Sequence, residues 1–190
     1  NGYYTVGGAW DRMRTHYLTK FFILGITFYG LQTVQGPTQA VRVVSSLIHY
    51  TDWVPGHVHM GTMGWVTMIV TAAIYYAIPK IYNTEIYSEK LANTHFWLVL
   101  VGQLVFSVTM WITGIRQGWL WKATGADGKL VHQNFIETLT GNYMFWHVRA
   151  LAGVIFTAGM LVFVYNVLMT IAKGKALAAK AGEQPAPAVA

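Results

Sequence analysis

The chain has 190 residues, of which 54% are hydrophobic, 15% aromatic and only 11% charged. Soluble domains carry roughly a quarter of charged residues, so this composition indicates a membrane protein and excludes an ordinary soluble domain. The net charge of +6 does not indicate nucleic-acid binding, because Lys and Arg lie at the ends of apolar segments and form no single stripe. The sequence contains no cysteine, which excludes disulfides and thiolate metal sites.

The first residues, NGYYTVGGAWDRMRT (1–15), are typical of a loop and lack the pattern of a signal peptide. The sequence starts with Asn1 in place of an initiator methionine. We therefore expect the chain to be the later part of a longer protein.

Four apolar stretches are long enough to cross a bilayer core, which takes about 20 residues. They cover about 18–40, 55–78, 91–115 and 143–172. Each is predicted to be a helix, because an isolated span must satisfy its own backbone hydrogen bonds. The sequence thus predicts an all-α integral membrane protein with four transmembrane helices in one region, 1–172.

The polar parts of the chain predict its orientation. Lys and Arg are more frequent near both termini and at 79–90 than at 41–54 and 116–142. Because cytoplasmic loops carry the excess of basic residues, the termini and 79–90 are predicted to be cytoplasmic. The tail at 173–190 is rich in Ala, Pro and Lys and is predicted to be disordered.

Two histidines stand one residue apart in PGHVHMG, residues 55–61, near the outer end of the second predicted helix. Helical residues at i and i+2 point about 200° apart, so His57 and His59 are expected to project from opposite flanks. They cannot chelate one metal ion together, but each can ligate a separate centre. Histidine is a common axial ligand of haem iron.

Two glycines support a haem on the His57 side. Gly61 and Gly64 follow His57 by four and seven residues and share its face, where small residues would let a haem plane approach. Glycines in membrane helices also serve helix–helix contact, and a membrane histidine can bond to a neighbouring helix. Spacing alone leaves haem ligation and these packing roles open.

A longer motif, HYTDWVPGHVHMGTMGW (49–65), resembles the signature of the catalytic subunit of cbb3-type cytochrome c oxidases, the C family of haem–copper oxidases. The resemblance covers nearly the whole chain apart from the tail. It implies that the chain forms the last four helices of a twelve-helix bundle. The other matching segments are GGAWDRMRT (7–15), HFW (95–97), MWITGIRQG (110–118), WHVRALAG (146–153) and YNVLMT (165–170).

The resemblance implies a role for each histidine of the pair. His57 matches the proximal ligand of high-spin haem b3, where oxygen binds, and is the candidate catalytic residue. His59 matches one axial ligand of low-spin haem b.

Four further residues at the outer ends of helices are candidates for contact with the haem propionates. His49 and Arg149 are assigned to them by charge and position, and Asp52 and Trp53 are further candidates. For Arg149 the alternative is an interfacial arginine that extends its charged head to water.

One residue departs from the family pattern. The family commonly has a glutamate before the Gly-Pro of the first helix here, whereas this chain has Gln35 in VQGPTQ (34–39). In the family that carboxylate lies near the proximal side of haem b3, where hydrogen bonds tune ligand basicity. Glutamine can still bond to the ligand but carries no charge, so either the haem potential differs or another group substitutes.

The remaining ligands are expected elsewhere in the subunit. Haem b needs a second axial histidine and the copper beside haem b3 needs three histidines, and no other group of histidines here has suitable spacing. The resemblance implies that the N-terminal part of the same subunit holds them. Calcium near the propionates is a further candidate cofactor.

The resemblance implies a proton-pumping respiratory oxidase in the bacterial cytoplasmic membrane, a lipid bilayer that the chain crosses several times. Electrons from cytochrome c would pass through membrane-anchored c-type cytochrome subunits to haem b and then to the haem b3–copper site, reducing dioxygen to water. Two alternatives remain: a nitric oxide reductase, which has non-haem iron in place of copper, and a non-catalytic haem-anchoring membrane subunit.

Overall fold

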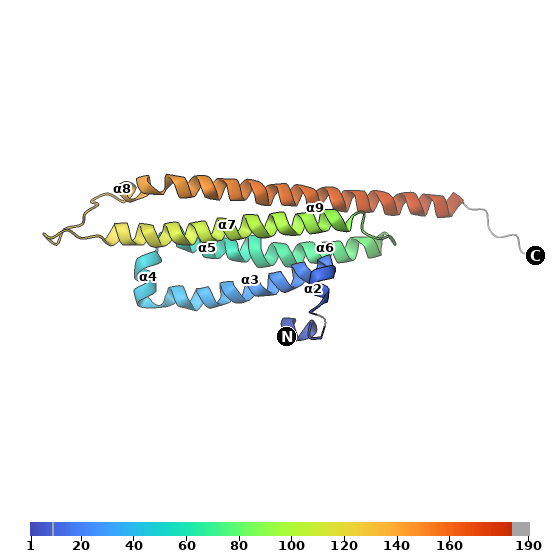
Figure 1. The fold of residues 1–190 in the computed structure, drawn as a ribbon, viewed down its shortest axis with the longest axis horizontal. Coiled ribbons are helices and arrows are strands. Elements are labelled where there is room, and N and C mark those ends of the chain that lie inside the picture. Colours follow the sequence, from blue (N-terminus) through green and yellow to red (C-terminus); the bar gives the residue numbers. More distant parts are fainter. Residues whose placement is uncertain (9, 184–190) are drawn as a thin grey trace, which may run out of the picture.

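The computed structural model describes residues 1–8 and 10–183, and the regular elements in these residues are all helices. One isolated β-bridge, between Thr124 and Leu130, lies in the loop that follows residue 122. They form an elongated bundle of long helical rods that alternate in direction along the chain (Figure 1). The elements are α1 (Gly2–Thr5), α2 (Arg12–Thr15), α3 (Tyr17–Ala40), α4 (Arg42–Ile48), α5 (Trp53–His59), η1 (Met60–Val66), α6 (Thr67–Ile81), α7 (Glu89–Lys122), α8 (Phe135–Leu139), η2 (Thr140–Asn142) and α9 (Tyr143–Glu183).

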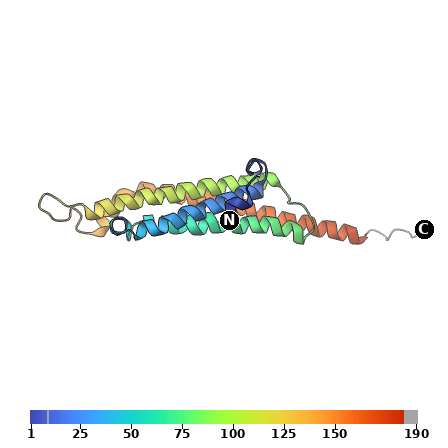
Figure 2. The ribbon, with the colours of Figure 1, turned by 90° about the horizontal axis from the view of Figure 1, so that it is seen from below.

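The second rod consists of three consecutive elements, α5, η1 and α6. It packs beside α3 and α7, while α9 packs mainly on α7 (Figures 1 and 2). The short helices α4 and α8 lie at one end of the bundle, and the connection from α6 to α7 lies at the other (Figure 1). An aromatic and aliphatic core joins the rods, with Phe21, Met68, Tyr75 and Val99 buried in it.

Three rods are long and apolar enough to cross a membrane: Trp53–Ile81, Glu89–Lys122 and Phe135–Gly182. They contain the predicted stretches 55–78, 91–115 and 143–172 and extend beyond them. Helix α3 agrees with the first predicted stretch, 18–40, and is 24 residues long. It is not among the three, because polar residues such as its repeated glutamines lower its hydropathy.

The tail prediction is wrong for residues 173–183. Helix α9 continues without a break to Glu183 and is 41 residues long. Ala, Leu and Lys dominate this stretch and are strong helix formers, so the helix can extend past its apolar part. The rest of the predicted tail, 184–190, lies outside the described residues.

The second rod contains a π-helix that the sequence did not predict. In η1 the backbone bonds change from the i→i+4 to the i→i+5 pattern, and the N–H of Thr67 bonds to the carbonyl of Thr62. Glycine weakens a regular α-helix, and Gly61 and Gly64 both fall in this segment. Single π turns inside α-helices are frequent at functional sites, and η1 begins directly after His59.

Candidate functional site

The imidazole of His57 is held between two helices. Its Nδ1 lies 3.2 Å from Oε1 of Gln35 on α3, and it is half-buried. The ring of Trp53, one turn earlier in α5, stacks nearly parallel to it at 9°, with 6.3 Å between ring centroids. Because the amide oxygen of Gln35 only accepts, the proton of a neutral His57 resides on Nδ1 and the lone pair on Nε2.

The imidazole of His59 is fixed within its own helix. Its Nδ1 donates to the carbonyl of Pro55, one turn earlier, at 2.7 Å. Phe106 of α7 packs against the ring with 4.8 Å between centroids. The carbonyl thus selects the tautomer of His59 that leaves Nε2 as the free lone pair.

In both rings Nε2 therefore carries the lone pair and is the nitrogen that could bind a metal ion. Among the described residues, Nε2 of neither ring takes part in a hydrogen bond. Iron-ligating histidines commonly donate their other N–H to a carbonyl or amide oxygen, so this pair fits axial ligation of haem. The predicted projection from opposite flanks is confirmed, since His57 contacts α3 and His59 contacts α7.

The glycines beside His57 have packing roles. A Cβ on Gly61 would overlap the side chain of Gln32, and one on Gly64 would lie 3.2 Å from Phe28. Both neighbours belong to α3, so side chains of α3 occupy the space where the sequence predicted a haem plane. The structure thus favours the alternative of helix–helix contact, and we do not propose Gly61 and Gly64 as haem contacts.

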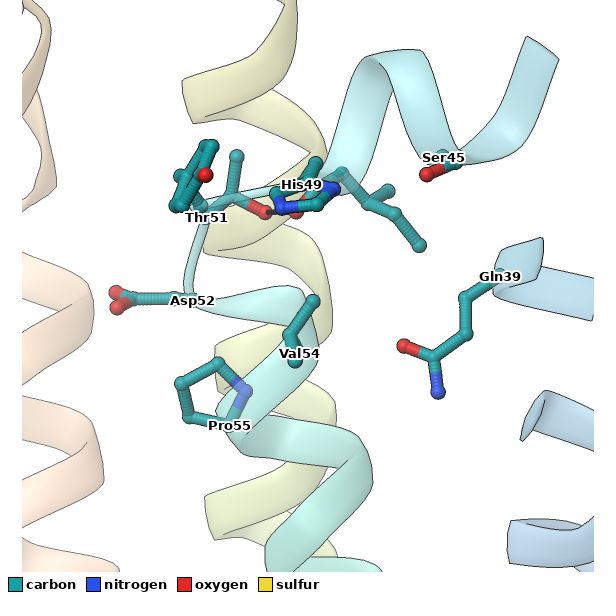
Figure 3. A pocket seen from close by; sticks show the side chains of 9 residues that line it. Gln39, Ser45, His49, Thr51, Asp52, Val54 and Pro55 are labelled. Atoms are coloured by element: carbon teal, nitrogen blue, oxygen red, sulfur yellow. Dashed lines mark hydrogen bonds between the residues drawn. The ribbon is translucent and has the colours of Figure 1, made fainter. Parts of the chain in front are cut away.

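A pocket of about 540 Å³ opens at the α4 end of the bundle, between α3, α4 and the start of α5. His49 and Gln39 line it from different elements (Figure 3). His49 is exposed and its ring lies 4.1 Å from that of Tyr50. The carboxylate of Asp52 extends away from this pocket (Figure 3).

Asp52 joins α5 to the last helix. Its Oδ2 accepts from Nε1 of Trp146 at 2.7 Å and lies 3.9 Å from Nη1 of Arg149. Its backbone N–H donates to Oε1 of Gln117 on α7 at 2.7 Å. Arg149 therefore has a protein carboxylate beside it, which the sequence did not predict.

Trp53 and two further histidines contact other protein groups. Trp53 lies over Gly114 of α7, where any side chain would collide with its backbone. His95 is fully buried, and its Nδ1 lies 3.2 Å from the hydroxyl of Tyr75. His147 donates from Nδ1 to the carbonyl of Tyr143 at 2.7 Å.

Two polar residues near the site were missed. Gln103 and Ser107 of α7 are both fully buried and bond to the backbone of α5. Polar side chains in an apolar span are costly and often functional, so their occurrence in GQLVFSVTM (102–110) was the available signal. Helical spacing could not show which neighbouring helix they contact.

The fold and the site define a multi-pass helical membrane protein that presents two imidazoles from opposite flanks of one rod, each able to offer Nε2 to a metal. The chain belongs to the family of cytochrome c and quinol oxidase polypeptide I, whose family model matches residues 1–155. This family of haem–copper oxidases implies haem and copper as cofactors.

Relatives place the chain within that family. It is 42% identical over 176 residues to the cbb3-type cytochrome c oxidase subunit CcoN1 of Stutzerimonas stutzeri, covering 92% of this chain and 37% of that protein. It is 25% identical over 137 residues to a nitric oxide reductase polypeptide of the same organism, covering 70% of this chain and 28% of that protein. The fold matches a heme–copper terminal oxidase dimer solved by cryo-EM, with a TM-score of 0.68 at 20% identity, over 88% of this chain and 30% of that one. The chain thus spans about a third of the length of these proteins.

Proposed function

We propose that this chain is the C-terminal part of the catalytic subunit of a cbb3-type cytochrome c oxidase. The observation that carries the proposal is the pair of imidazoles on different flanks of one rod. Each has Nδ1 bonded to an oxygen, and Nε2 has no hydrogen bond within the part of the chain that the structure describes. The 42% identity to a cbb3-type subunit supports the oxidase over other members of the family.

In this proposal His57 would hold the iron of haem b3, and Gln35 would keep the ring in the tautomer that leaves Nε2 for the metal. His59 would hold the iron of haem b, with Pro55 in the corresponding role. When bound, the metals would supply the redox chemistry, in which electrons from cytochrome c pass through haem b to the haem b3–copper site and reduce dioxygen to water with proton pumping.

The residues at the α4 end of the bundle would receive the haem propionates. His49 is exposed beside the pocket and is free to approach a carboxylate. Arg149 and Trp53 remain candidates, with Asp52 setting the position of the Arg149 head. A calcium ion near the propionates belongs to the same proposal.

The membrane arrangement is part of the proposal. We infer that α3 crosses the bilayer beside the three more apolar rods, so that the chain supplies four of the twelve helices of the subunit. Both termini would face the cytoplasm and α4 and α8 the opposite side of the bacterial cytoplasmic membrane. The antiparallel order of the rods is consistent with this orientation.

The other ligands would come from the rest of the subunit. Among the described residues, no group of three or more His, Cys, Asp or Glu side chains is arranged to hold a metal ion. We propose that the N-terminal part of the subunit supplies the copper ligands and the second axial histidine of haem b. Membrane-anchored c-type cytochrome subunits would deliver the electrons.

The test uses the purified complex that contains this chain. Reduced-minus-oxidised and CO-difference spectra, together with metal content, should show two b haems, one of which binds CO, and one copper. Non-haem iron in place of copper would identify a nitric oxide reductase instead. A complex with haem that consumes no oxygen would favour the non-catalytic anchoring subunit.

A further inference from the structure

Gln103 of α7 bonds to the backbone of the ligand-bearing rod. Its side chain is fully buried, and Nε2 donates to the carbonyl of His59 at 3.1 Å and to Oγ of Ser107 at 2.8 Å. Ser107 Oγ donates in turn to the carbonyl of Gly56 at 3.5 Å. Two residues one turn apart on α7 thus bond to the carbonyl that precedes His57 and to the carbonyl of His59 itself.

These bonds act where the rod is least regular. Backbone carbonyls inside an α-helix are normally satisfied by the N–H four residues on. His59 is the last residue of α5, and η1 begins at Met60 with i→i+5 bonds. A donor from a second helix can therefore fix the position of the His59 backbone at the point where the internal pattern changes.

The donor and the acceptor of the Gln103 amide have different surroundings. Its Oε1 has no hydrogen-bond partner among the described residues, and a buried acceptor left unpaired costs about 1–3 kcal/mol. Its two donated bonds offset part of that cost. What the residue does provide is a fixed distance between α7 and the His59 carbonyl.

We propose that Gln103, assisted by Ser107, is a positioning residue for His59. It acts through the backbone of His59, while Pro55 holds the ring at Nδ1 and Phe106 packs on its face. The backbone bond and the ring bond together fix the orientation of the imidazole plane about its Nε2 axis. The inference rests on the proposed function, in which His59 is an axial ligand of haem b.

The test replaces Gln103 with methionine in the complete complex. Gln103→Met keeps a similar length and volume but removes both donors. The readouts are the EPR g values and the α-band of the low-spin haem, which depend on ligand-plane orientation, and haem b content. We expect shifted g values and a turnover rate about tenfold lower, the effect typical of losing an outer partner of a metal ligand.

Thr113→Val is the matched control, because Thr113 is also buried on α7 but its hydroxyl bonds to the carbonyl of Thr109 in its own helix. The CO-difference spectrum of the other haem serves as an internal control for folding. A shift in Gln103→Met alone, with an intact CO spectrum, supports the proposal. Unchanged low-spin signals in Gln103→Met overturn it.

If the Gln103→Met complex does not assemble, the same spectra are measured on a Ser107 variant. In that case Ser107→Ala, the smaller change, decides: a smaller shift of the low-spin signal supports the proposal and an unchanged signal overturns it. The proposed function has a separate test. If the low-spin haem is absent from the wild-type complex, or persists in His59→Ala, the proposed function fails, whereas an unchanged low-spin signal in Gln103→Met alone overturns only the Gln103 inference.

Discussion

His57 of α5 and Gln35 of α3 are joined across two rods, with His57 Nδ1 at 3.2 Å from Gln35 Oε1. The residues lie 22 positions apart in the sequence and meet because α3 and α5 run antiparallel around the α4 corner. The bond leaves His57 Nε2 as the atom able to bind iron. If His57 ligates haem iron as proposed, the neutral amide at this position would determine how strongly the ring donates to the metal.

Changing Gln35 should therefore alter the haem on His57. Gln35→Leu removes the acceptor, and we expect activity to fall about 10–100-fold, as for other outer partners of metal ligands. Gln35→Glu restores a negative charge, which should lower the midpoint potential of the CO-binding haem because the charge stabilises ferric iron. The rate of oxygen consumption measures the first change, and redox titration of the CO-binding haem measures the second. Thr38→Val, three residues further on α3, is the control, because this hydroxyl bonds to the carbonyl of Val34 in its own helix. Identical rates and titrations for all variants would contradict the prediction.

The two histidines should be separable by mutation. His57→Ala is expected to abolish CO binding and oxygen consumption while the low-spin haem spectrum persists. His59→Ala is expected to remove the low-spin spectrum and to stop turnover while some CO-binding haem remains. The physical reason is that each ring is held by a different neighbour, so loss of one leaves the other in place. Optical spectra of the purified variants decide, and parallel loss of both haems in both variants would argue against separate centres.

The contact between α7 and α9 should depend on glycine at position 102. A Cβ there would lie 2.8 Å from the backbone nitrogen of Phe156 and 2.9 Å from the carbonyl oxygen of Ala152. Gly102→Ala is expected to cost about 1–3 kcal/mol by overpacking, because backbone atoms cannot move aside as a side chain can. Thermal inactivation in detergent measures the change. Gly153→Ala on α9 is the matched control, since nothing lies within 4 Å of its Cβ position, and equal loss in both variants would refute the prediction.

Asp52 should matter more as an acceptor than as a charge. Its ion pair with Arg149 is long, at 3.9 Å, and partly exposed, so the charge is worth about 0–1 kcal/mol. Asp52→Asn keeps an oxygen that can accept from Trp146, whereas Asp52→Ala leaves the indole N–H unpaired. We expect Asp52→Ala to lower the unfolding temperature and Asp52→Asn to change it little. A loss in Asp52→Asn as large as in Asp52→Ala would show that the charge dominates.

Much of the fold could be predicted because apolar length is a local property. The stretch at 18–40 agrees with α3 within one residue at its start, and the other three stretches fall inside observed rods. Helix ends were predicted less well, since α7 and α9 continue into polar sequence that hydropathy does not identify as helical. The π-helix at Met60–Val66 could not be predicted, because its two glycines weaken a regular α-helix without indicating which bonding pattern replaces it.

For the site, too, the sequence predicted local features, and the packing of the helices decided the contacts between them. The spacing of His57 and His59 alone determined that the rings leave opposite flanks, because i and i+2 positions diverge on any helix. Only the tertiary structure decided that Gly61 and Gly64 pack on α3, that Asp52 lies beside Arg149, and that Gln103 bonds to the His59 carbonyl. Helical periodicity states which face a residue occupies, but the partner across that face is set by how the rods pack together.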